Sequence, residues 1–207
     1  VIAMIGAALL WVGWFGFNAG SALAANQNAA MAMLVTHISA AAATITWMFI
    51  DWYKNGKPGL VGMITGMVAG LATVTPASGF IGPIGGLILG ISSGAVCYWF
   101  VGFVKTSLNI DDSLDVFAVH GVGGILGALL CGLLATESFG GLGLEPTVWE
   151  QTKVQIIGIA SVALYTFVVT KIIVIITEKL VGLRVSEQEE NTEGLDFGSH
   201  GESSYHL

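Results

Sequence analysis

The chain has 207 residues, of which 54% are hydrophobic and only 10% are charged, and its mean hydropathy is +0.80. A soluble domain usually carries about 25% charged residues, so this composition excludes a soluble globular protein and indicates an integral membrane protein. The formal net charge of −7 arises mainly from a tail that holds six of the fourteen acidic residues, and the seven scattered Lys and Arg residues exclude a nucleic-acid-binding surface.

Six apolar segments are candidates for membrane spans, each of which needs about 20 residues with a range of roughly 17–25. In chain order they cover residues 1–24, 28–52, 60–76, 82–106, 114–136 and 152–181. The third is short and rich in glycine, and it ends at a cluster of helix-breaking residues, Thr75 to Gly79. The sequence therefore predicts an all-α, polytopic membrane helix bundle over residues 1–183 and a separate tail over residues 184–207.

The basic residues predict the orientation of the bundle. If the six segments alternate in direction, five of the seven Lys and Arg residues fall on one side of the membrane: Lys54, Lys57, Lys105, Lys179 and Arg184. Loops rich in Lys and Arg usually face the cytoplasm, so we expect a cytoplasmic tail in a plasma-membrane protein. From Ser186 onward the apolar pattern stops, and we expect this segment to be disordered or docked on a partner.

The first segment carries a stripe of residues at helical spacing, in positions i, i+4, i+7 and i+11. These residues are Leu10, Trp14, Phe17 and Ser21, and they share one face of a helix. The stripe is either a packing face or the wall of a pore. In the second case its outer end offers a hydroxyl acceptor and aromatic faces to a small cation.

The fifth segment contains His120 within a glycine-rich run. An ionisable side chain inside a membrane span is costly and suggests a functional role. Four glycines follow it and are expected to keep that side of the helix thin, so that another helix or a small solute can approach the imidazole: Gly121, Gly123, Gly124 and Gly127. Val116 is expected to share the face of His120.

Three acidic residues, Asp111, Asp112 and Asp115, precede this helix and are interpreted as helix caps. His37 in the second segment is expected to be buried and to bond with a neighbouring helix, with Thr36 and Ser39 as available partners. Thr75 is either a pore hydroxyl or a helix-end residue. A less favoured alternative takes His37 and His120 as the axial ligands of a b-type haem. Another is a membrane sensor that signals through its tail.

Four stretches resemble the ammonium transporter family (Amt/Mep/Rh). They are WVGWFGFNAGS at 11–21, VTPASGFIG at 74–82, DDSLDVFAVHGVGG at 111–124, and the tail pieces GLRVS at 182–186, GLD at 194–196 and HGE at 200–202. The resemblance covers essentially the whole chain. It implies helices six to eleven of an eleven-helix bundle, that is, the second half of an inverted repeat and the last helix, followed by the cytoplasmic tail.

The resemblance also implies roles for particular residues. His120 corresponds to the second of twin pore histidines, Phe17 to one of two gate phenylalanines, and Ser21 to the serine of an outer recruitment site. Leu10, Trp14, Val116 and Thr75 correspond to the pore lining, and Asp112 to a structural carboxylate at a helix start. The implied partners are ammonium or ammonia as substrate, the lipid bilayer, two further copies in a homotrimer, and a PII signalling protein. A transporter without cofactor or metal is expected, not an enzyme.

One departure qualifies this resemblance. The family's first pore histidine, second gate phenylalanine and outer tryptophan belong to helices one to five, which the chain does not match. The chain also starts at Val1 inside an apolar run. We therefore expect the natural protein to be longer, and the chain alone to form half a pore with an open face.

Overall fold

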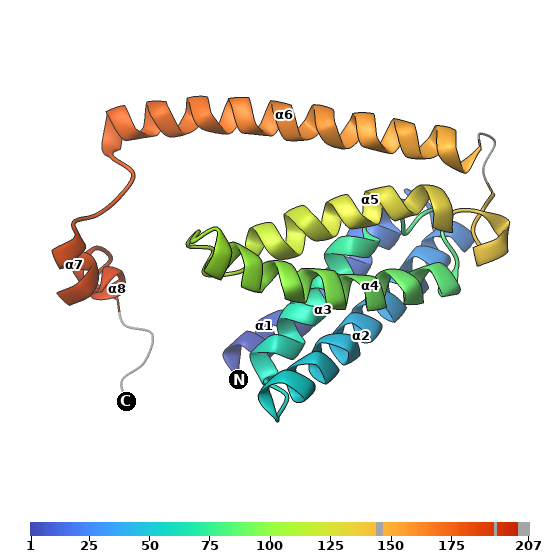
Figure 1. Cartoon of the computed structure of the whole chain (residues 1–207), viewed down its shortest axis with the longest axis horizontal. Coiled ribbons are helices and arrows are strands. Elements are labelled where there is room, and N and C mark those ends of the chain that lie inside the picture. Colours follow the sequence, from blue (N-terminus) through green and yellow to red (C-terminus); the bar gives the residue numbers. More distant parts are fainter. Residues whose placement is uncertain (144–146, 193, 203–207) are drawn as a thin grey trace. The chain divides into compact units, whose positions relative to one another are not determined.

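The structure is a computed structural model that describes residues 1–143, 147–192 and 194–202. The chain divides into two units, Val1–Ile159 and Ala160–Leu207, each of which is considered by itself. All regular elements of the described residues are helices (Figure 1). The first unit contains α1 (Ile2–Gly20), α2 (Gln27–Asn55), α3 (Leu60–Val74), α4 (Pro83–Gly102), the π-helices η1 (Phe103–Ser107) and η2 (Phe117–Val122), α5 (Gly123–Leu134) and the 3₁₀ turn η3 (Glu137–Phe139). The helix α6 (Val148–Val181) runs from the first unit into the second, which also holds α7 (Glu187–Thr192) and α8 (Leu195–Gly198).

Each of the six predicted segments contains a helix, which confirms the all-α membrane class. Five helical stretches are long and apolar enough to cross a membrane: Ile2–Gly20, Gln27–Asn55, Pro83–Ser107, Phe117–Leu134 and Val148–Val181. The third segment forms only the 15-residue helix α3. It ends before Pro76, because proline has no N–H with which to continue the helix. Pro83 instead lies in the first turn of α4, where this N–H is not needed.

Small residues let three helices of the first unit approach one another closely around Ser39. This residue lies on α2, which packs against both α3 and α4 (Figure 1). A Cβ atom built on Gly70 of α3, or on Gly90 of α4, would lie 2.5 Å from the backbone oxygen of Ser39. The Ser39 hydroxyl also donates a 2.9 Å hydrogen bond to the backbone oxygen of Gly70. Close backbone contact and interhelical hydrogen bonds are typical of helices packed inside a membrane.

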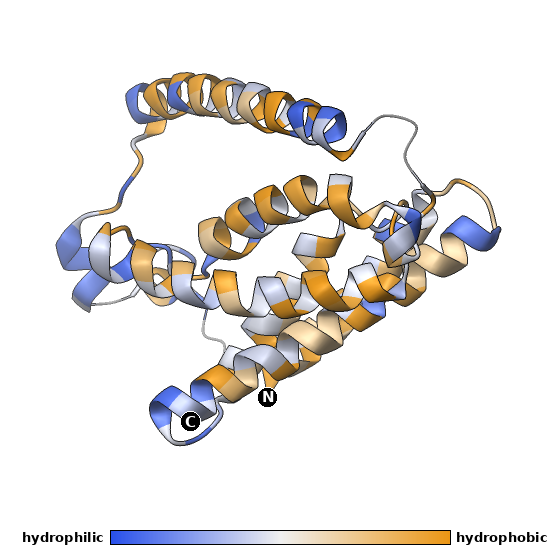
Figure 2. Cartoon of the chain, turned by 45° about the vertical axis from the view of Figure 1, so that its right-hand side comes forward, coloured by the Kyte–Doolittle hydropathy of each residue, from blue (hydrophilic) through white to orange (hydrophobic). Residues whose placement is uncertain are grey.

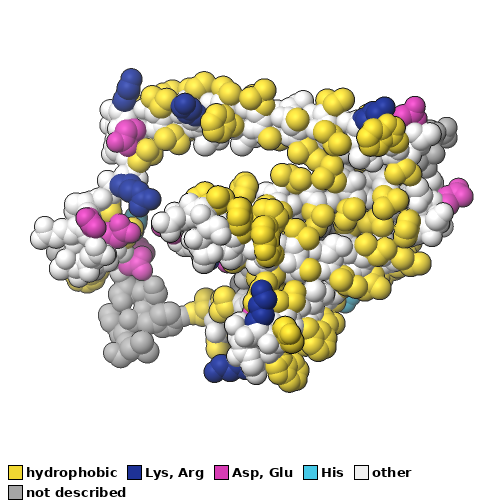
Figure 3. Space-filling model, viewed as in Figure 1, with side chains coloured by type: hydrophobic (Ala, Val, Ile, Leu, Met, Phe, Trp, Pro, Cys, Tyr) yellow, Lys and Arg dark blue, Asp and Glu magenta, His cyan; other side chains and the backbone are white. Residues whose placement is uncertain are grey.

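Hydrophobic side chains cover much of the visible surface of the molecule (Figure 3). In α6 the hydrophobic residues run along most of the helix and hydrophilic ones gather near its ends (Figure 2). None of the residues of α6 is buried. Such a surface cannot be stable in water, so these faces require lipid or other apolar helices around them.

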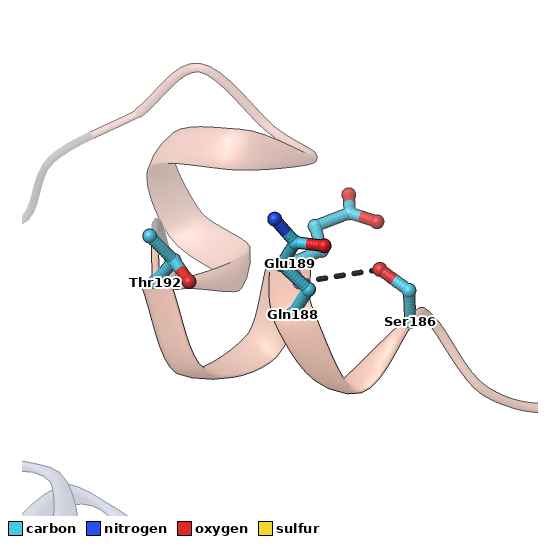
Figure 4. A pocket seen from close by; sticks show the side chains of 4 residues that line it. All are labelled: Ser186, Gln188, Glu189 and Thr192. Carbon is cyan, nitrogen blue, oxygen red and sulfur yellow. Dashed lines mark hydrogen bonds between the residues drawn. The ribbon is translucent and has the colours of Figure 1, made fainter.

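The tail forms two short helices, where the sequence predicted disorder or docking. Ser186 caps α7 by accepting a 3.2 Å hydrogen bond from the backbone N–H of Glu189 (Figure 4). The Ser199 hydroxyl donates to the Glu189 carboxylate at 3.0 Å. No residue among the described positions 182–192 and 194–202 is buried, so local hydrogen bonds hold these helices without a core.

Candidate functional site

The stripe predicted on α1 forms the wall of an open recess. Leu10, Gly13, Trp14 and Phe17 line this recess, whose volume is about 230 Å³. The rings of Trp14 and Phe17 lie 5.9 Å apart. Leu10 is 45% exposed and Phe17 63% exposed, whereas Trp14 is half-buried and also packs against a buried cluster that includes Leu71. We call this recess the aromatic recess.

His120 stands beside the same stripe. Its ring lies 6.3 Å from the ring of Trp14, centre to centre, and the two planes are inclined by only 22°. The histidine is exposed in this chain and belongs to the π-helix η2. π-Helices are rare and occur frequently at functional sites. The structure thus brings an imidazole from η2 and an indole from α1 together beside the aromatic recess.

Thr75 holds the indole in place. The Trp14 Nε1–H donates a 2.8 Å hydrogen bond to Oγ1 of Thr75, and the Thr75 hydroxyl in turn donates to the backbone oxygen of Leu71 at 2.8 Å. Both bonds have good geometry for hydrogen bonds of these types. Thr75 therefore acts on the site from the end of α3, through Trp14.

The three acidic residues before η2 have three different roles, which corrects the interpretation that all are helix caps. Asp112 is a cap, because its carboxylate accepts hydrogen bonds from the backbone N–H groups of Val116 at 2.8 Å and Phe117 at 2.9 Å. Asp111 accepts from the hydroxyl of its neighbour Ser113. Asp115 has a positive φ of 58° and forms a 2.6 Å ion pair with Lys105 of η1. Val116 precedes η2 and is 52% exposed.

The glycines after His120 do not all keep the space beside the imidazole open. A Cβ atom on Gly123 would lie 2.7 Å from Oγ1 of Thr73, and one on Gly127 would overlap the backbone oxygen of Thr73. These two glycines therefore allow α5 to approach α3. Gly124 has nothing within 4 Å of its Cβ position. Hydrogen bonds in a π-helix run from residue i to residue i+5. His120 of η2 therefore does not share a helix face with Gly123 and Gly127, as it would in a regular α-helix.

His37 is exposed in this chain, so the prediction of a buried histidine bonded to Thr36 or Ser39 is wrong. Its ring packs on α1, at 5.2 Å from the ring of Trp11 and 6.0 Å from that of Phe15. The two hydroxyls are used elsewhere: that of Thr36 donates to the Ala32 backbone oxygen and that of Ser39 to Gly70. His37 contacts Trp11 and Phe15 of α1, whereas His120 contacts Trp14.

Ser21 lies at the end of α1 in a second recess, which we call the polar recess. Its volume is about 340 Å³, and its polar and aromatic lining residues are Asn18, Ser21, Asn28, Thr75, Ser78 and Phe80. The Ser21 hydroxyl donates to the backbone oxygen of Phe17 at 2.7 Å. Thr75 lines this recess and bonds to Trp14 of the aromatic recess, so the two recesses are neighbours along α1.

The sequence interpretation assigned no chemical role to Asn18 or Ser78. Asn18 is 5% exposed and donates from Nδ2 to Oγ1 of Thr36 at 2.9 Å. An amide in the last turn of an apolar helix was the available signal, because a buried polar side chain needs a hydrogen-bond partner. The partner was not predictable, because Thr36 lies on another helix.

Comparison with known proteins agrees with this geometry. A sequence model described as the Ammonium Transporter Family matches residues 1–205. The ammonium transporter of Aquifex aeolicus (strain VF5) is 45% identical over 207 residues, which is 100% of this chain and 48% of that protein. The chain spans about half the length of the curated relatives it matches.

Solved structures share the fold as well. A structure titled "Sensor Amt Protein" matches with a TM-score of 0.83 and 29% identity, covering 92% of this chain and 48% of that one. The crystal structure of Mep2 from Saccharomyces cerevisiae matches with a TM-score of 0.82 and 33% identity, covering 91% and 45%.

Proposed function

The chain belongs to the ammonium transporter family, and from this premise we propose that the protein containing it moves ammonium or ammonia across a membrane through a narrow hydrophobic pore. The observation that carries the proposal is the pairing of His120 with Trp14 beside the open aromatic recess. An imidazole beside an apolar passage gives the protein a group that can hold or move a proton where few other polar groups are present.

Proton chemistry follows from the cost of moving an ion through such a passage. An isolated cation the size of ammonium loses tens of kcal/mol of solvation, by idealised estimates, when it enters an apolar interior. Neutral ammonia avoids this cost. We therefore propose that ammonium gives up a proton on the way and that ammonia passes through the pore. K⁺ has no proton to release, so its dehydration cost excludes it.

Recruitment of ammonium is assigned to the outer end of α1. The Ser21 hydroxyl donates its hydrogen to Phe17, which leaves the lone pairs of its oxygen available to an N–H of ammonium. Aromatic faces attract cations, and Phe17 is exposed beside this position. Phe17 then acts as the gate through which the substrate enters the part of the pore lined by Leu10, Trp14 and Val116.

We assign to His120 the binding of ammonia and the transfer of the released proton. A neutral imidazole has one donor and one acceptor nitrogen, and an apolar environment favours the neutral form. Together with a second histidine from the remainder of the protein, His120 would form hydrogen bonds with ammonia. The two imidazoles would also pass on the proton that ammonium releases. This pair is the twin-histidine pore that the family resemblance implies.

Methylammonium uptake tests this assignment. In proteoliposomes of the full-length protein, His120→Ala should abolish uptake of labelled methylammonium or let K⁺ pass. His37→Ala is the matched control, because His37 also packs on α1 but against Trp11 and Phe15, which do not line the aromatic recess, and it should transport as the wild type does. Unchanged uptake and unchanged K⁺ exclusion in His120→Ala would overturn the proposed role.

We further propose a plasma-membrane location with the tail in the cytoplasm and assembly as a homotrimer. The orientation is supported by basic residues in or just after the ends of α2, η1 and α6, because such residues favour the cytoplasmic side. They are Lys54, Lys57, Lys105, Lys179 and Arg184. A PII protein of nitrogen regulation is the partner proposed for the tail. Native mass spectrometry of the purified protein tests the number of subunits.

A sensor that signals through its tail is the second candidate, because one structural relative is titled "Sensor Amt Protein". The proteoliposome assay separates the two: a sensor without transport would bind ammonium yet show no methylammonium uptake in the wild type.

A further inference from the structure

We propose that the polar recess binds ammonium through neutral oxygen atoms, with Asn18 and Ser78 as additional ligands beside Ser21. The proposal rests on the proposed function for the identity of the ligand. The structural argument does not depend on that function, because it rests on which hydrogen atoms of the side chains around the recess already take part in hydrogen bonds. The hydroxyls of Ser21, Thr75 and Ser78 donate their hydrogens to backbone oxygens, so each oxygen can act only as an acceptor towards a ligand. A ligand that donates hydrogen bonds therefore fits the recess.

Asn18 shows this most clearly. The Thr36 hydroxyl donates its only hydrogen to the backbone oxygen of Ala32 at 2.6 Å, so the Thr36 oxygen acts only as an acceptor towards Asn18. The Asn18 amide must then present its NH₂ group to Thr36. This fixes the orientation of the amide, which the shape of the side chain alone does not reveal. Its carbonyl oxygen, Oδ1, remains for the recess that Asn18 lines.

The hydroxyls of the recess follow the same rule. Ser21 donates to the backbone oxygen of Phe17 at 2.7 Å and Thr75 to that of Leu71 at 2.8 Å. Ser78 donates to the backbone oxygen of Thr75 at 3.3 Å and is 5% exposed. The Thr75 oxygen also accepts from Trp14, so it has one lone pair left, whereas Ser21 and Ser78 each have two. Together with Asn18 they give three neutral acceptors from α1 and the turn after α3.

The charge and size of the recess agree with a small cation that passes through. Its lining contains no charged residue among the described positions, and it includes the phenyl ring of Phe80, which is 54% exposed. Neutral oxygens and an aromatic face attract a cation without holding it as a carboxylate would. A transport pathway needs such weak binding, so that the ligand can leave again. A volume of about 340 Å³ also leaves room for hydration water, since one water takes about 30 Å³.

The experiment compares two serines in the full-length protein. Ser78→Ala removes one proposed ligand, while its hydrogen bond to Thr75 is long and contributes little. Ser93→Ala is the matched control, because Ser93 is also buried and also donates to the backbone oxygen three residues earlier, at 3.0 Å, but it lies in α4 away from the recess. Asn18→Leu is the second variant. It removes the amide oxygen and leaves the Thr36–Ala32 bond intact.

The readouts are the KM and maximal rate of methylammonium uptake, and the rise in unfolding temperature that ammonium chloride causes relative to potassium chloride. We expect Ser78→Ala and Asn18→Leu to raise KM about threefold to tenfold, as for the loss of one typical hydrogen bond. The maximal rate should stay within about twofold, and the ammonium-specific stabilisation should shrink.

A wild-type KM in Ser78→Ala, or an equal rise in Ser93→Ala, would overturn the site. A lower maximal rate with unchanged KM would do so too, because it indicates a structural role. Failure of the proposed transport is recognised separately. In that case the wild type takes up no methylammonium, whereas ammonium-specific stabilisation that depends on Ser78 still supports the site.

Discussion

The indole nitrogen of Trp14 on α1 donates a 2.8 Å hydrogen bond to the hydroxyl of Thr75, the residue that follows α3. This bond joins two helices at the point where the Trp14 ring stands against His120. The hydroxyl of Thr75 is itself fixed to Leu71, so the indole has one preferred orientation. The position of the aromatic wall beside the imidazole is thus set from α3.

The Trp14–Thr75 bond can be tested with two substitutions of similar size. Thr75→Val keeps the shape and removes the acceptor, which leaves the half-buried indole N–H unpaired at a cost of about 1–3 kcal/mol. We expect reduced methylammonium uptake and a lower unfolding temperature. Thr75→Ser keeps the hydroxyl and should restore both. If Val and Ser behave alike, the bond does not position Trp14.

The cap at Asp112 can be tested against its neighbour. Asp112→Ala removes the acceptor for the backbone N–H groups of Val116 and Phe117 and should destabilise the start of η2 by about 1 kcal/mol. Because η2 carries His120, uptake should fall together with the unfolding temperature. Asp111→Ala removes a charge from the same loop without touching η2 and is the control. An equal effect of both would mean that charge, not capping, is responsible.

The contact between α5 and α3 predicts opposite outcomes at two glycines. Gly127→Ala would place a methyl group on the backbone oxygen of Thr73, whereas Gly124→Ala points into open space. Overpacking typically costs about 1–3 kcal/mol, so Gly127→Ala should lower the unfolding temperature of the purified protein. Gly124→Ala should leave it nearly unchanged unless another part of the protein packs there. A stable Gly127→Ala variant would show that α5 can move away from α3.

Removal of the tail tests its proposed role separately from that of the proposed pore. Truncation after Gly182, which follows α6 and has a positive φ of 78°, deletes α7 and α8. We expect loss of PII binding in a pull-down assay and altered uptake, with K⁺ still excluded. Unchanged PII binding and uptake would contradict the proposed role of the tail.

The sequence was sufficient for the helices and for much of the aromatic stripe. Apolar length predicted the spans, and the 3.6-residue period placed Leu10, Trp14 and Phe17 in one recess. Asp112 was correctly interpreted as a cap from its place before an apolar helix. These features depend on residues close together in the sequence.

Hydrogen bonds and packing contacts with residues of another helix could not be predicted from the sequence. The bond from Trp14 to Thr75 spans 61 positions, and that from Asn18 to Thr36 spans 18. The exposure of His37 could not be deduced from its place within an apolar segment. Gly123 and Gly127 were expected to admit another helix or a small solute, and they admit α3, but the identity of that helix could not be predicted from spacing.

The π-helix also makes the number of residues in this stretch a structural determinant. In a continuous α-helix, each residue turns by about 100°, so His120, Gly123 and Gly127 would share one side. The extra residue of η2 therefore separates the direction of the imidazole from that of Gly123 and Gly127. If the same residues closed ordinary α-helical hydrogen bonds, His120 would turn towards the neighbour of these two glycines, so a shift of hydrogen bonds within η2 would change the site without any change of sequence.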